Sequence, residues 1–176
     1  VLVEWNDSAA EYPRDKCVHA LFEEHAARTS ESTAVVFENQ QLTYRELNQQ
    51  ANQLAHWLIQ QDVGPDTLVG LCVERSPRMI VGLLGILKAG GAYLPLDVRL
   101  PRPRLEFLLR DAEVRILVSE KGLLARLPVE HRRAICLDGE ASQLAKLPCD
   151  NPLRVGQPED LAYVMYTSGS TGQPKG

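Results

Sequence analysis

The sequence has few cysteines, and they do not form a recognisable motif. They are Cys17, Cys72, Cys136 and Cys149, and none forms a C-x-x-C pair. This spacing argues against a disulfide framework and against a zinc site. Cys72 lies in an apolar run, where a thiol is expected to act as a small buried hydrophobic side chain. The cysteine usage favours a reducing compartment, and we expect the cytoplasm.

Long apolar segments and an excess of positive charge are also absent. No run approaches the length of a membrane span, and the first residues lack the basic start and apolar core of a signal peptide. A net charge of −4 gives no reason to expect a nucleic acid or an anionic membrane as partner. The 176 residues, 44% hydrophobic and 24% charged, suit one globular domain. Because the chain starts with Val1 instead of methionine, we expect it to begin inside a longer protein.

Two common nucleotide-binding patterns are missing from the end of the chain. Gly169 is followed by four residues and then Pro174, where a P-loop requires a second glycine, and Lys175 is followed by Gly176 instead of a hydroxyl residue. No G-x-G-x-x-G fingerprint is present either. A P-loop nucleoside triphosphatase and a Rossmann dehydrogenase are therefore disfavoured.

The composition of this terminal stretch nevertheless suits a polyphosphate. Glycines allow a backbone to approach an anion closely, hydroxyl groups donate hydrogen bonds, and lysine supplies a positive charge. The donors or flexible positions are Thr167, Ser168, Gly169, Ser170, Thr171, Gly172 and Lys175. A flexible linker would have a similar composition, but the stretch directly follows the apolar run Leu161–Met165, which predicts a buried, parallel strand.

Three segments carry a resemblance to a known family. The run and the glycine-rich stretch together resemble the phosphate loop of adenylate-forming enzymes, and they are most similar to the adenylation domains of nonribosomal peptide synthetases. Leu42–Leu47 resembles the first core motif of these domains, and Leu87–Asp97 resembles the second. The order and the rough spacing of the three segments agree with the family, which is more specific than any single motif.

The resemblance implies an α/β fold, a mostly parallel sheet with flanking helices, that forms the N-terminal part of the large adenylation domain. Residues 1–16 resemble the linker that follows a condensation domain, and residues 17–176 would be an incomplete AMP-binding domain. The parent enzyme would activate an amino acid with ATP to aminoacyl-AMP and pyrophosphate. It would then load the aminoacyl group on a phosphopantetheine carrier domain downstream.

The resemblance also assigns roles to the loop. The residues named above from Thr167 to Lys175 would bind the ATP phosphates, with Mg²⁺ held mostly by residues outside this chain. No catalytic residue and no metal ligand is assigned within the chain, so the chain alone is expected to be inactive and to fold poorly. Two alternatives remain: an acyl-CoA or aryl-acid ligase of the same superfamily, and a non-enzymatic phosphate-binding protein.

Hydrophobic periodicity predicts alternating strands and helices. Helices are expected at 17–28, 44–61, 77–89 and 104–111, with a short one at 120–127, and strands at 33–37, 67–73, 92–95, 114–118 and 133–137. Residues 38–41 are expected to form a turn, in which Asn39 is a residue that tolerates the left-handed conformation. Residues 139–160 are polar and proline-rich, which predicts a long surface connection. This alternation favours a largely parallel sheet.

The helix that starts at Tyr44 has the most specific pattern. Thr43 and Glu46 are spaced as a capping box. Its apolar stripe runs from Leu47 to Ile59, and its solvent-facing side is expected to be Gln49, Asn52, Gln53, His56 and Gln60. In the helix 77–89, Lys88 lies in the last turn, where the helix dipole favours a cation, and we expect no direct chemical role for it.

Overall fold

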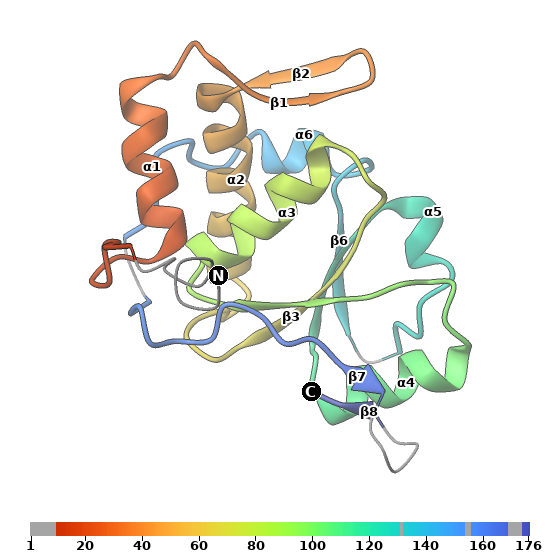
Figure 1. Cartoon of the computed structure of the whole chain (residues 1–176). Helices are drawn as coiled ribbons and strands as arrows, with labels where there is room; N and C mark the ends of the chain where they lie inside the picture. Colours follow the sequence, from red (N-terminus) through yellow and green to blue (C-terminus); the bar gives the residue numbers. More distant parts are fainter. Residues whose placement is uncertain (1–9, 131, 154–155, 169–173) are drawn as a thin grey trace, which may run out of the picture.

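A four-stranded parallel sheet forms the centre of the molecule (Figure 1). The computed structural model describes residues 10–130, 132–153, 156–168 and 174–176. The strands lie in the order β4 (Ala92–Pro95), β3 (Leu68–Cys72), β5 (Ile116–Ser119) and β6 (Arg133–Cys136). Each neighbouring pair is parallel, which confirms the predicted fold class.

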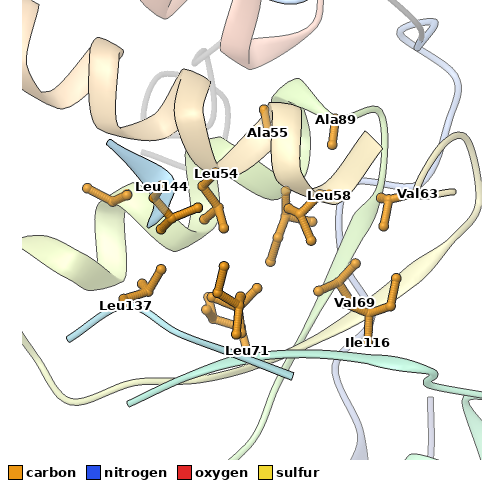
Figure 2. Close-up of a cluster of buried hydrophobic side chains, with 14 of the residues drawn as sticks. Leu54, Ala55, Leu58, Val63, Val69, Leu71, Ala89, Ile116, Leu137 and Leu144 are labelled. Atoms are coloured by element: carbon orange, nitrogen blue, oxygen red, sulfur yellow. The ribbon is translucent and has the colours of Figure 1, made fainter. Parts of the chain in front are cut away.

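Helices cover both faces of this sheet. On one face, α2 (Tyr44–Ile59) and α3 (Pro77–Lys88) pack over side chains of β3, β5 and β6, and Figure 2 shows the resulting cluster. On the other face, α4 (Arg102–Asp111) packs over a second cluster that includes Leu94 and Leu117. Side chains of β3 enter both clusters, so its continuous apolar run reflects burial on two sides.

The remaining elements lie around this core. They are α1 (Val18–Arg28), β1 (Thr33–Phe37), β2 (Gln40–Thr43), α5 (Lys121–Leu124), α6 (Ala141–Leu144), β7 (Thr167–Ser168) and β8 (Pro174–Lys175). Strands β1 and β2 form an antiparallel hairpin. Its left-handed residue is Glu38, with φ 53°, and not Asn39. Among the described residues, no helix has both the length and the apolar character needed to cross a bilayer.

The two upstream motifs are architectural. Thr43 Oγ1 accepts the backbone N–H of Glu46, and the Glu46 carboxylate accepts the N–H of Thr43, which confirms the capping box. The hydrogen bonds that the Thr43 N–H and the Thr43 hydroxyl donate to this carboxylate lower the pKa of Glu46. In the second motif, Gly91 N–H bonds Ile86 O and Gly90 N–H bonds Leu87 O, a Schellman ending with Gly90 at φ 83°. Its Asp97 is held by Arg99, whose hydrogen bonds lower the pKa of that carboxyl to about 2.

One prediction about α2 was wrong: Asn52 is fully buried instead of solvent-facing. The described part of residues 139–160 is mostly exposed, as predicted for a surface connection, but it also includes α6 and a segment that runs across α2. This segment covers the polar side of α2, so helical periodicity alone could not distinguish a polar contact surface from a solvated one.

Candidate functional site

The candidate phosphate loop begins and ends in a short antiparallel hairpin. Thr167 pairs with Lys175, and Ser168 pairs with Pro174. Directly opposed residues of an antiparallel pair project from the same face of the ladder, so the Thr167 hydroxyl and the Lys175 ammonium share one side. Both residues are exposed. The hairpin therefore presents a donor and a cation together at the base of the loop.

The other predicted loop residues cannot be placed. Gly169, Ser170, Thr171 and Gly172 lie outside the described residues. Of the seven predicted phosphate-binding positions, the structure brings Thr167, Ser168 and Lys175 together. The roles of all seven remain predictions.

The run that leads to this hairpin was predicted to be a buried strand, and that prediction was wrong. It forms one parallel bridge with β4, between Tyr93 and Tyr163. The Tyr93 N–H donates to Ala162 O at 3.1 Å, and the Val164 N–H donates to Tyr93 O at 3.1 Å. Leu161, Tyr163 and Met165 are 48%, 51% and 56% exposed. Only alternate side chains reach the core, because the run lies at the edge of the sheet beside β4 and is covered on one side.

The base of the hairpin is fixed on α4, the helix that follows β4. Tyr166 Oη donates a hydrogen bond to Asp111 Oδ2 at 2.5 Å, and its ring meets that of Phe107 edge-on at 6.5 Å. Desolvation, together with this bond to a carboxylate, raises the pKa of Tyr166 to about 12. Figure 1 shows β7 and β8 beside α4. A Cβ added to Gly176 would lie 2.8 Å from the Tyr166 ring, so the second arm of the hairpin also packs closely there.

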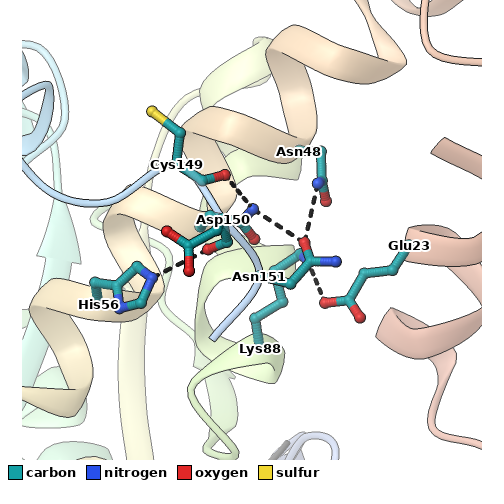
Figure 3. A network of polar contacts seen from close by, with 8 residues as sticks. Glu23, Asn48, His56, Lys88, Cys149, Asp150 and Asn151 are labelled. Carbon is teal, nitrogen blue, oxygen red and sulfur yellow. Dashed lines mark hydrogen bonds and ion pairs between the residues drawn. The ribbon is translucent and has the colours of Figure 1, made fainter. Parts of the chain in front are cut away.

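A polar network lies at the start of the segment that leads to the run (Figure 3). Asn151 Oδ1 accepts hydrogen bonds from Asn48 Nδ2 at 3.0 Å, Asn52 Nδ2 at 3.0 Å and Lys88 Nζ at 3.2 Å. Lys88, 2% exposed, also forms an ion pair with Glu23 of α1. Burial lowers the pKa of Lys88, and the hydrogen bond and charge of Glu23 oppose that shift.

Sequence reasoning missed this network. Lys88 was assigned to the helix dipole and Asn52 to solvent, whereas both are buried and bind a segment far along the chain. One signal was available: a lone lysine on a helix that is apolar nearly all round must either reach solvent or find a buried partner. The described residues contain no group of three or more His, Cys, Asp or Glu side chains that could hold a metal ion.

Comparison with known proteins gives this geometry a context. The model of the family described as AMP-binding enzyme matches residues 22–176. The chain belongs to this family. AMP-binding enzymes use ATP, so the paired donor and cation at Thr167 and Lys175 lie in a chain of a nucleotide-using family.

Curated relatives of this AMP-binding chain are peptide synthetases. It is 49% identical over 177 residues to tyrocidine synthase 3 of Brevibacillus parabrevis and 48% identical over 176 residues to gramicidin S synthase 2 of Brevibacillus brevis. It is also 48% identical over 176 residues to bacitracin synthase 1 of Bacillus licheniformis. These matches cover 100% of the chain but only 3%, 4% and 3% of the respective relatives, so the chain corresponds to a small segment of each.

Solved structures show the same segment. The nonribosomal peptide synthetase FmoA3 with bound α-methyl-L-serine-AMP matches with a TM-score of 0.86 and 33% identity, over 98% of this chain and 19% of that one. The N-terminal subdomain of Klebsiella oxytoca NpsA, in complex with 3-hydroxybenzoyl-AMSN, matches with a TM-score of 0.77 and 25% identity, over 95% and 42%. The AMP-binding chain therefore has the fold of the N-terminal part of an adenylation domain.

Proposed function

We propose that this chain is part of an adenylation domain that activates an amino acid with ATP in a nonribosomal peptide synthetase. The observation that carries the proposal is the hairpin at Thr167 and Lys175, which flanks the glycine- and hydroxyl-rich stretch. All of this chain matches a segment of a peptide synthetase, with 49% identity. In the reaction, a carboxylate oxygen of the amino acid attacks the α-phosphorus of ATP. The bond from that phosphorus to the bridging oxygen of the β-phosphate breaks, and pyrophosphate leaves with the electron pair.

Such a reaction needs alignment and charge stabilisation more than covalent help from the protein. Lys175 would place a positive charge beside the β- and γ-phosphates, and the Thr167 hydroxyl would donate a hydrogen bond to them. Thr167, Ser168, Gly169, Ser170, Thr171, Gly172 and Lys175 form the proposed contact set. Magnesium would accompany the nucleotide, but the described residues contain no cluster of three or more His, Cys, Asp or Glu side chains to hold it, so we assign it no ligand here.

Larger assemblies belong to the same proposal. Residues 1–16 would link an upstream condensation domain to an AMP-binding domain that starts at residue 17. A downstream carrier domain would receive the aminoacyl group on its phosphopantetheine thiol. The great length of the synthetases among the relatives supports this arrangement, because the chain covers no more than 5% of them.

The proposal is tested by amino-acid-dependent exchange of pyrophosphate into ATP, measured in the full-length protein that contains this sequence. We expect exchange with at least one amino acid, and Lys175→Ala should lower kcat/KM for ATP roughly tenfold to a hundredfold, because a preorganised donor at the transferred group is lost. Lys146→Ala, a substitution of another exposed lysine, serves as the matched control. Equal kinetics for the two variants would refute the assigned role of Lys175.

A second candidate is an aryl-acid ligase, favoured by the match to NpsA with its 3-hydroxybenzoyl-AMSN ligand. The identity of 25% is lower than the 33% found for FmoA3. Running the same exchange assay with hydroxybenzoates in place of amino acids separates the two candidates. Exchange with the aryl acids alone would replace the amino-acid proposal.

A further inference from the structure

The corner between α3 and β4 contacts the segment 151–164 at three points, all of them within its described residues 151–153 and 156–164. At one end, Lys88 of α3 bonds the side chain of Asn151. In the middle, a Cβ built on Gly156 would lie 3.8 Å from the Cα of Gly90, so the two backbones approach each other closely. At the other end, Tyr93 bonds the backbone of Ala162 and Val164. Residues 88–93 therefore contact both ends of the segment 151–164, which leads to the hairpin of β7 and β8.

The anchor at Asn151 is the best-defined of these contacts. Its Oδ1 faces three donors, of which Lys88 carries a full charge. The Lys88 side chain is 0% exposed, is paired with Glu23 and lies 5.9 Å from the centre of the Phe22 ring, so its ammonium has a fixed place. The Lys88 bond, at 3.2 Å, is slightly longer than the two amide bonds at 3.0 Å, but a hydrogen bond from a charged donor contributes more to stability than a neutral one. A buried, immobile cation therefore fixes where the segment starts.

The contacts at the other end of the segment, between the run Leu161–Met165 and β4, are weaker. A single bridge joins the run to β4, and the outer side chains of the run are exposed. A slip of one residue in a strand turns every side chain to the opposite face. Such a slip would move Tyr166 away from Asp111 and shift Thr167 and Lys175 with it. Apart from the contacts of Tyr166 with α4 and the stacking of Tyr163 on Tyr93, one bridge resists such a slip, so the point at which the segment begins contributes to the register of the run.

We propose that Lys88 and Asn151 are positioning residues, whose hydrogen bond sets the register of the run that carries the phosphate loop. The proposal rests on the function proposed above, because it takes the loop to bind ATP. The pair touches no nucleotide itself. It acts through the segment 151–164, and so it should affect the use of ATP and leave the amino-acid site unchanged.

Two substitutions of one residue test this in the full-length protein. Asn151→Ala removes the acceptor and leaves the ion pair of Lys88 with Glu23 intact, so the variant should fold. Asn151→Asp keeps an oxygen acceptor for the same donors. We expect Asn151→Ala to raise the KM for ATP about fivefold to tenfold, which corresponds to the loss of one hydrogen bond to a charged group. The KM for the amino acid should change less than about twofold, and Asn151→Asp should restore the KM for ATP.

A matched control and a second measurement separate positioning from loss of stability. Gln53→Ala removes contacts of α2 with Leu147 O and Cys149 Sγ but leaves Asn151 in place, and should keep wild-type kinetics. Hydrogen exchange should accelerate at the Tyr93 and Val164 amides in Asn151→Ala, while amides of β3 that pair with β5 keep their protection.

The outcomes are distinct. Unchanged KM for ATP in Asn151→Ala, an Asp variant as impaired as the Ala variant, or faster exchange throughout the sheet would each overturn the positioning role. If the wild-type protein catalyses no pyrophosphate exchange with any acid, the proposed function fails. In that case the exchange rates at Tyr93 and Val164 still decide whether Asn151 fixes the run.

Discussion

The Tyr166 hydroxyl joins the base of the candidate phosphate loop to the end of α4. Its partner is the Asp111 carboxylate, and the adjacent Phe107 ring covers one side of the tyrosine. Because the phenol donates to an anion, ionising it would place two negative charges side by side. Desolvation by burial, followed by the hydrogen bond to Asp111 and its charge, raises the pKa of Tyr166 to about 12. The protonated phenol is thus the form that stabilises the fold.

This shift predicts a pH dependence of stability. A raised pKa in the folded state contributes stability that is complete below the unfolded pKa of about 10 and is lost as the pH rises toward the folded value. Tyr166→Phe should lower the free energy of unfolding at pH 7 by about 1 kcal/mol, at the low end for a bond to a charged group because the site is half-exposed. Urea titrations at pH 7 and at pH 11 measure both effects. The wild-type advantage over the variant should shrink at the higher pH, and an advantage that stays constant would contradict the assignment.

Asn52 is a buried amide whose donors stabilise the segment across α2. Its Nδ2 bonds Cys149 O at 2.7 Å and Asn151 Oδ1 at 3.0 Å, while its Oδ1 is buried without a partner in the described structure. Asn52→Ala should lower the free energy of unfolding by about 2 kcal/mol, because it leaves Cys149 O without its donor and creates a small void. Gln53→Ala, on the partly exposed neighbour, should change it by less than about 0.5 kcal/mol. Equal losses of unfolding free energy in the two variants would show that the buried side chain of Asn52 stabilises the fold no more than the partly exposed side chain of Gln53 does.

At the scale of elements, α3 packs closely on α2 at Gly85 and on β3 at Gly82, because these two positions lack a side chain. A Cβ on Gly85 would lie 2.6 Å, 2.8 Å and 3.0 Å from Cδ2, Cγ and Cβ of Leu54. On Gly82 the nearest atom is the tip of Leu71, Cδ1, at 2.7 Å, and the next is 3.7 Å away. Leu71 can rotate its tip away, whereas Leu54 meets Gly85 along its whole stem. Gly85 therefore sets the distance between the two helices.

These contacts predict different outcomes for the same substitution. Gly85→Ala should lower the free energy of unfolding by about 1–3 kcal/mol through overpacking, despite the better helix propensity of alanine. Gly82→Ala should change it little, since a gain of about 1 kcal/mol in propensity offsets the shift of Leu71. Gly122→Ala in α5, where no atom lies within 4 Å of the added Cβ, should stabilise by about 0.5 kcal/mol. Thermal unfolding ranks the three, and stabilisation by Gly85→Ala would refute the close packing.

A feature could be predicted from the sequence when its interacting groups lie close together along the chain, and not when they lie far apart along it. The capping box of α2 and the glycine ending of α3 were predicted because every group involved lies within six residues. The burial of Lys88 and Asn52 was not, since their partners lie 63 to 99 residues away. In the candidate site, the loop composition indicated phosphate binding, but the pairing of Thr167 with Lys175 depends on a hairpin that periodicity does not show.

For the whole molecule, the edge beyond β4 exposes large apolar side chains. Leu161, Tyr163 and Met165 project from it, and the Tyr163 ring stacks on that of Tyr93 at 5.5 Å without being buried. A sheet edge that exposes apolar side chains and unpaired backbone groups tends to associate with other chains. In isolation, these 176 residues should therefore self-associate as their concentration rises.

Two charges at this edge should suppress that association. Leu161→Glu combined with Met165→Glu places like charges on a chain whose net charge is already −4, and because both positions are exposed the fold should lose little stability. Sedimentation velocity across a concentration series should show the wild-type chain shifting to larger species and the double variant remaining monomeric. Val36→Glu, at a position 62% exposed on β1, is the matched control and should associate like the wild type. A wild-type chain that stays monomeric throughout, or suppression by Val36→Glu alone, would show that the edge beyond β4 does not drive association.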